Sequence, residues 1–284
     1  MTSSDSAILE KLRELEQTEG KLPDFLKMYR ELLSLQVKVK ADTSIAECPS
    51  PETARGKLDQ GLPMLQFHEL DMDWKRYAGL FTQVAKVLRK YDVLSKDDAK
   101  AIEKASENED SLAETVRSLY DNDHSTIPEG IRPGQFELAA MIALWPFLSR
   151  CAAELSPLVQ QWSWTRNICP VCGGPPDFGY LEKGEGARWL LCSRCDTAWP
   201  YRRLKCPYCG NEDQDDLSYL ASEDGLYRLY LCEQCHKYLK VVDLRKTETE
   251  VLLPLERLLT LDMDRQAHEM GYMPAQAQTQ TSTD

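Results

Sequence analysis

The stretch from Cys169 to Cys235 decides how this chain folds. It begins with Cys169-Pro-Val-Cys172-Gly173 and continues through Cys192-Ser-Arg-Cys195, Cys206-Pro-Tyr-Cys209-Gly210 and Cys232-Glu-Gln-Cys235. These four C-x-x-C pairs hold eight of the ten cysteines and are separated by 19, 10 and 22 residues. The short middle gap divides them into two tandem units of the form C-x₂-C, loop, C-x₂-C, a spacing typical of metal sites.

Two C-x-x-C pairs supply four thiolates, the ligand set of structural zinc and of rubredoxin-type iron. We predict two metal ions, each bound by four cysteines, with the first pair joining the second and the third joining the fourth. The predicted ligands are Cys169, Cys172, Cys192, Cys195, Cys206, Cys209, Cys232 and Cys235. Interleaved pairing, the choice between iron and zinc, and an iron–sulfur cluster stay open. The simplest role for such metals is to fold small β units that lack a sufficient core.

The residues before and after the cysteines indicate an α+β chain. Residues 1–165 carry apolar side chains at helical spacing, and residues 135–164 are the most apolar stretch. We expect that stretch to be a buried helix, kinked or broken at Pro146 and Pro157, with an exposed docking surface as the alternative. Residues 41–66, rich in proline and glycine, are expected to form a loop.

The predicted organisation follows from this change of pattern. A helical domain, two tandem rubredoxin-like or zinc-ribbon β modules, a C-terminal helix and a disordered tail are expected. Their predicted ranges are residues 1–165, 166–203, 204–247, 248–273 and 274–284.

Charge and composition restrict the function. The chain has 46 acidic and 34 basic residues, a net charge of −12, which argues against a general nucleic-acid binder. The net negative charge is unevenly distributed along the chain. Residues 166–210 hold 7 basic and 4 acidic side chains, a net charge of +3. No uninterrupted apolar run reaches about 18 residues and no signal peptide begins the chain, so we expect a cytoplasmic protein without membrane insertion. Disulfides are not expected in that compartment.

Other candidate residues carry little chemistry. No nucleotide-binding, zinc-protease or nucleophile-elbow motif is present in the sequence, and no acid–base pair stands out, so we do not expect an enzyme. His236 follows a predicted ligand but is expected to be an ordinary polar residue. Cys48 and Cys151 are expected to bind no metal, and Cys151 to lie in the core.

The sequence resembles the formate dehydrogenase accessory proteins, the FdhE-like family. The resemblance rests on an ordered set of stretches rather than on a bare C-x-x-C. Besides the first cysteine pair with Gly173, these are Leu144–Leu155 (LWPFLSRCAAEL), Arg188–Trp199 (RWLLCSRCDTAW), Arg203–Gly210 (RLKCPYCG), Cys232–Lys240 (CEQCHKYLK) and Leu258–Tyr272 (LLTLDMDRQAHEMGY).

The resemblance implies a helical region followed by two rubredoxin-like modules that hold iron. It also implies a chaperone-like, cytoplasmic role in protein maturation, in which the catalytic subunit of formate dehydrogenase is bound before assembly. The Trp199–Lys205 strip, which is both basic and aromatic, is a candidate surface for that partner together with a groove beside the helical region. The alternative is that the strip is a solvated linker between the modules. Self-association as a homodimer is left open.

Two other functions compete with this one. A rubredoxin-like redox protein would cycle iron between its two oxidation states. A zinc-ribbon nucleic-acid binder is allowed by the basic residues near Arg202 but opposed by the net charge of −12.

Overall fold

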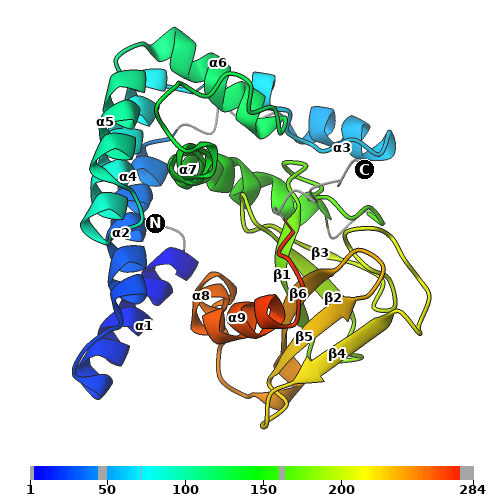
Figure 1. The fold of residues 1–284 in the computed structure, drawn as a ribbon. Helices are drawn as coiled ribbons and strands as arrows, with labels where there is room; N and C mark the ends of the chain where they lie inside the picture. The colour runs from blue at the N-terminus through cyan, green and yellow to red at the C-terminus, as the bar shows by residue number, and fades with distance from the viewer. Residues whose placement is uncertain (1–2, 44–49, 71, 160–163, 276–284) are drawn as a thin grey trace, which may run out of the picture. The chain divides into compact units, whose positions relative to one another are not determined.

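The computed structural model describes residues 3–43, 50–70, 72–159 and 164–275, which fold as two compact units (Figure 1). The first unit contains Met1–Ser50 and Leu65–Glu154, and the second contains Pro51–Met64 and Leu155–Asp284. The expected order of a helical region, a sheet with two cysteine groups and C-terminal helices is confirmed. The domain limits at residues 165, 203, 247 and 273 stay predictions, and of the predicted disordered tail residues 276–284 lie outside the described residues.

The first unit is helical. Its elements are α1 (Ser3–Glu19), α2 (Asp24–Asp42), the short η2 (Phe67–Glu69), α4 (Trp74–Lys90), α5 (Lys96–Ala105), α6 (Glu109–Tyr120) and most of α7 (Pro133–Val159), up to Glu154. Ser95 caps α5 as a capping box: its side chain accepts from the Asp98 backbone N–H, and Asp98 accepts from the Ser95 N–H. The expected loop at residues 41–66 is wrong in part, because α3 (Pro51–Asp59) begins with a proline in its first turn.

Helix α7 runs unbroken through both prolines, so the expected break in this stretch is wrong. A proline at position 146 has no N–H to donate to the carbonyl of Ile142, four residues earlier. The side chain of Gln36 in α2 donates to that carbonyl oxygen instead, at 2.8 Å from Nε2. Gln36 is itself 7% exposed, so a buried amide replaces the missing helical hydrogen bond.

By length and composition α7 could cross a membrane, and it is the one helix of this kind in the described residues. However, 61% of its most apolar window is buried inside the protein. A buried core helix passes the same test, so this helix is weak evidence for a membrane span.

The second unit is built on one six-stranded sheet. Its strands are β1 (Pro176–Leu181), β2 (Arg188–Cys192), β3 (Ala198–Pro200), β4 (Leu217–Ala221), β5 (Tyr227–Cys232) and β6 (Lys237–Asp243), and η3 (Leu244–Lys246) follows. The strand order is β3-β2-β1-β6-β5-β4. Each predicted module is therefore a three-stranded antiparallel meander, and the two meanders have the same order.

The two modules join edge to edge through β1 and β6. These strands pair in parallel, with Phe178 opposite Lys240 and Leu181 opposite Asp243. The other neighbouring strands pair antiparallel. Phe178 and Val242 are fully buried where the two modules join, so the modules share one hydrophobic core and are not separately folded domains.

The predicted C-terminal helix is two helices, α8 (Leu253–Leu259) and α9 (Leu261–Glu269). Lys240 Nζ donates to the carbonyl oxygens of Arg257 and Thr260 where α8 ends, and contacts Asp264 at 2.6 Å. A cation at a helix C-terminus satisfies free carbonyls and opposes the helix dipole, which stabilises the break between α8 and α9. Helix α9 packs Met263 and Ala267 against β5 and β6 (Figure 1).

Candidate metal centres

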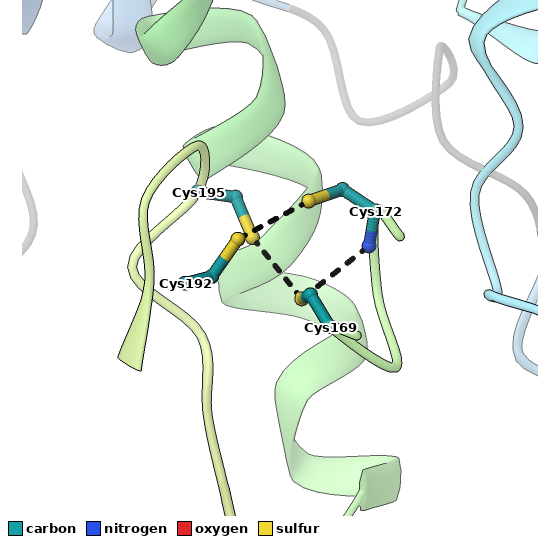
Figure 2. Close-up of side chains that lie close together, drawn as sticks. All are labelled: Cys169, Cys172, Cys192 and Cys195. Carbon is teal, nitrogen blue, oxygen red and sulfur yellow. Dashed lines mark hydrogen bonds between the residues drawn. The ribbon is translucent and has the colours of Figure 1, made fainter. Parts of the chain in front are cut away.

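The first cysteine group lies between the loop before β1 and the turn after β2. Figure 2 shows the four side chains of this group pointing toward one another. The Sγ atoms of Cys169 and Cys195 are 3.6 Å apart, and those of Cys172 and Cys192 are 3.4 Å apart. All four residues are at most 3% exposed. A group this close and this buried forms an enclosed site of four sulfur atoms.

The backbone around Cys169 forms the turn that directs two sulfurs to one point. The Gly173 N–H donates to the Cys169 carbonyl oxygen at 2.9 Å, and the Cys172 N–H lies 3.5 Å from Cys169 Sγ. Gly173 has a φ of +72°, a conformation that favours glycine. A Cβ on Gly174 would lie 3.0 Å from Cys192 Sγ, so the close approach of this chain to the sulfur also requires a glycine.

The second group repeats this arrangement with more exposure to solvent. Sγ separations are 3.7 Å for Cys206 and Cys235 and 3.7 Å for Cys209 and Cys232. Cys206 and Cys232 are buried, Cys235 is partly buried and Cys209 is exposed. Gly210, with a φ of +78°, stands where Gly173 stands in the first group.

Both groups fit one metal ion in tetrahedral coordination. Metal–sulfur bonds of about 2.3 Å in a tetrahedron place the sulfur atoms about 3.8 Å apart. The Sγ atoms of each group all lie within 4.8 Å of one another, and the eight thiols are free rather than paired as disulfides. The structure therefore brings the predicted cysteines together in two groups that could each hold a metal ion, with adjacent rather than interleaved pairs. Their role as ligands stays a prediction.

Without a metal ion, burial favours the protonated thiol at Cys169 and at Cys206. Burial raises the pKa of Cys169, and it raises the pKa of Cys206 to about 11. Since a metal binds thiolate rather than thiol, a bound cation has to supply the charge that deprotonates the group. Cation binding and the stability of the fold are thereby linked at both sites.

Arg257 supports the first group, although no pattern in the sequence predicted this role. This α8 residue contacts Asp196 at 2.5 Å from Nη1, donates to the Cys192 carbonyl oxygen at 2.6 Å, and forms an ion pair with Asp177 at 3.0 Å. Burial alone would lower the pKa of Arg257, but the negative charges of Asp177 and Asp196 raise it. No sequence motif marks Arg257, because it lies more than 60 residues after the turn at Asp196 that it contacts.

The proposed Trp199–Lys205 surface is wrong in its aromatic part. Trp199 is 0% exposed and Tyr201 is 7% exposed, so both rings belong to the core. The basic part is engaged as well, since Glu212 contacts Lys205 at 2.7 Å and Arg202 at 3.4 Å. Glu212, in the acidic segment after the third cysteine pair, therefore pairs with two of the basic residues, while Arg202 and Arg203 remain exposed.

The remaining candidates are His236, Cys151 and Cys48, none of which belongs to the two groups of four sulfurs. His236 has a φ of +51° and packs against Tyr272, with ring centroids 6.0 Å apart. Cys151 is fully buried in α7, as predicted, and is disulfide-bonded, which was not expected. Cys48 lies outside the described residues.

Comparisons with known proteins match this site and this fold. Residues 168–203 match the family model described as FdhE, central domain. Protein FdhE homolog of Aquifex aeolicus is 35% identical over 153 residues, so the match spans about half of each protein, 52% of this chain and 53% of that relative. Protein FdhE of Salmonella enteritidis is 28% identical over 274 residues, which cover 93% of this chain and 83% of that protein.

A solved structure extends the likeness to nearly the whole chain. The crystal structure of the FdhE protein from Pseudomonas aeruginosa has a TM-score of 0.65 and 25% identity, and the match covers 96% of this chain and 94% of that one. The resemblance predicted from the cysteine stretches is confirmed: this chain is similar to FdhE proteins, in the match to the FdhE central domain and in the fold.

Proposed function

We propose that this chain is an accessory protein in the maturation of formate dehydrogenase and is not itself a dehydrogenase. The observation that carries the proposal is the match of residues 168–203 to the FdhE central domain, a range that contains the whole first cysteine group. The relatives are called Protein FdhE, which fits a formate dehydrogenase role. We further infer that the chain binds the catalytic subunit of that enzyme in the cytoplasm before assembly.

Affinity capture tests this partner directly. The tagged full chain, purified with its metal content measured, should retain the immature catalytic subunit in a fixed stoichiometry. Lys183→Gln, which removes only an exposed ion pair with Glu248, serves as the matched control and should bind equally well. Metal-loaded wild-type protein that retains no catalytic subunit would overturn the proposed partner.

The requirement for the chain is tested in cells. A strain lacking it should lose formate dehydrogenase activity, and the full chain supplied in trans should restore that activity. Unchanged activity in that strain would contradict a maturation role. Purified chain that oxidises formate by itself would contradict the assignment as a non-enzyme.

The metal we propose for both groups is iron. Four thiolates suit iron and zinc equally in geometry, so the choice follows the family resemblance stated above. Protein purified without oxygen should contain iron and show visible thiolate-to-iron absorption after oxidation. Colourless protein loaded with zinc and able to restore activity would assign zinc.

A redox protein is the second candidate, and the exposure of Cys209 favours it. A ligand at the surface places a metal close enough to solvent for electron exchange with a partner. The test is reversible bleaching of the absorption by reductant, with a Cys206→Ser variant that loses the signal from the second group. Full function with zinc alone would exclude this candidate.

A further inference from the structure

A cavity of about 470 Å³ lies beside the second cysteine group, within the second unit. Cys206 and Cys232 line it, whereas Cys209 and Cys235 do not. The space is therefore not the position that a metal would take among the four sulfurs. Its volume is in the range of pockets that hold small organic molecules.

The cavity contains a buried cation without a matching anion. Arg188 of β2 is 3% exposed, and no described carboxylate forms an ion pair with it. Its Nη2 group donates to the carbonyl oxygens of Arg202 and Lys205, but its Nε has no hydrogen-bond partner among the described residues. Burying a charge without a counter-charge is unfavourable, and burial lowers the pKa of Arg188.

Two tyrosine hydroxyls in the same cavity are also unsatisfied. Tyr208 Oη and Tyr230 Oη are buried, and neither has a hydrogen-bond partner in the described part of the chain. The Tyr230 ring lies 5.7 Å from the Arg188 guanidinium. Unsatisfied buried donors are rare in native proteins, so three that line one cavity indicate a group that accepts from them.

The rest of the wall is apolar and aromatic. Leu217, Leu231 and Leu239 line the cavity, and Tyr219 is 49% exposed and lies against Tyr230 with ring centroids 5.4 Å apart. A ligand that fits this lining needs an anionic end for the donors and a flat apolar body for the rings.

We propose that this cavity binds a small organic anion, a carboxylate or phosphate monoester carried on a flat apolar body. The anionic oxygens accept from Arg188 Nε and from the hydroxyls of Tyr208 and Tyr230, and the apolar body lies against Tyr219 and the leucines. The site is independent of the proposed role in formate dehydrogenase maturation. The opposing explanation is that Arg188 only balances the charge of the thiolates and fixes residues 202–205.

Titration of the metal-loaded full chain with simple probes decides between these explanations. Benzoate and phenyl phosphate represent the two anionic ends, and benzyl alcohol is the neutral probe of the same body. Calorimetry should show one saturable site for at least one anion, with affinity about 10-fold or more above benzyl alcohol, since hydrogen bonds to a charged group are the stronger ones. The tighter of the two anions identifies the type of anionic end.

Two variants assign binding to the cavity. Arg188→Gln should weaken the anion about 10-fold to 100-fold. Because Arg188 also holds residues 202–205, Tyr230→Phe provides a second variant that removes only a hydroxyl and should weaken the anion several-fold while leaving metal content unchanged. Lys183→Gln, away from the cavity, should bind like wild type.

Two results would overturn the proposal. One is the absence of saturable binding of either anion to wild-type protein. The other is binding that neither Arg188→Gln nor Tyr230→Phe weakens relative to Lys183→Gln, which would leave Arg188 with its structural role alone.

Discussion

Arg257 and Asp196 join α8 to the turn that carries Cys192 and Cys195, with Arg257 Nη1 lying 2.5 Å from Asp196 Oδ1. Asp196 has a φ of +60°, a conformation that is costly for a residue other than glycine. The contact holds this strained turn from a helix far along the chain, and a second hydrogen bond reaches the Cys192 carbonyl oxygen. The C-terminal helices therefore belong to the architecture of the first cysteine group.

Replacing Arg257 by Met should destabilise the second unit and the first metal centre together. The change removes the Arg257 cation from Asp177 and Asp196, and removing one partner of a largely buried pair costs about 3 kcal/mol. Urea unfolding should show this loss, and chelators should remove the metal of the first group faster. Lys183→Gln, which breaks an exposed pair, should change stability by less than about 1 kcal/mol. Equal stability of the two variants would contradict the role of Arg257.

Gln36 should be required for the stability of the fold, because Pro146 leaves the Ile142 carbonyl oxygen in α7 without a helical hydrogen bond. Gln36→Met keeps the side-chain length but leaves the Ile142 carbonyl oxygen without its donor, which should cost about 1–3 kcal/mol. The free energy of unfolding from urea titration measures the loss.

A double-mutant cycle tests that explanation. In a Pro146→Ala background the helix supplies its own N–H to Ile142, so Gln36→Met should cost clearly less there. An equal cost in both backgrounds would mean that Gln36 contributes through packing rather than through this hydrogen bond.

Gly174→Ala should impair the first metal centre selectively. The new Cβ would lie 2.9 Å from the Arg194 side chain and 3.0 Å from Cys192 Sγ, so a ligand has to shift. We expect lower metal occupancy at the first group and normal occupancy at the second, measured by metal analysis of variants that keep one group each. Gly184→Ala, where nothing lies within 4 Å of the new Cβ, is the control and should keep full occupancy. Normal occupancy in Gly174→Ala would show that the loop adapts.

The two metal centres should exchange at different rates. The first group is buried on every side, whereas Cys209 of the second is exposed and Cys235 is partly buried. A chelator in excess should therefore remove one metal equivalent quickly and the other slowly. Cys206→Ser should abolish the fast phase and Cys169→Ser the slow one, and a single phase for both metals in wild-type protein would contradict this difference.

Local signals in the sequence predicted much of the fold. Ser95 marks the start of α5 because its side chain accepts from a backbone N–H three residues later. The spacing of the cysteine pairs predicted which four sulfurs meet, because in each module one pair precedes and the other follows a hairpin of two strands, β1–β2 or β4–β5. Such features depend on residues close together in the chain.

Features that depend on distant residues were missed. Pro146 predicted a break in α7, and only the fold shows that Gln36 of α2 replaces the hydrogen bond to Ile142 that the proline removes. Trp199 and Tyr201 looked like surface aromatics because short strands do not reveal which face is covered. The parallel join of β1 and β6, and the contact of Arg257 with Asp196, likewise have no counterpart in local sequence.

The most direct measurement is the number of metal ions per chain, determined by native mass spectrometry on full-length protein purified without oxygen. Two ions are expected for wild-type protein, and one each for Cys169→Ser and for Cys206→Ser, because each variant removes a ligand from a different group. Wild-type protein that holds fewer than two ions, or a Cys169→Ser variant that still holds two, would contradict two separate four-cysteine centres.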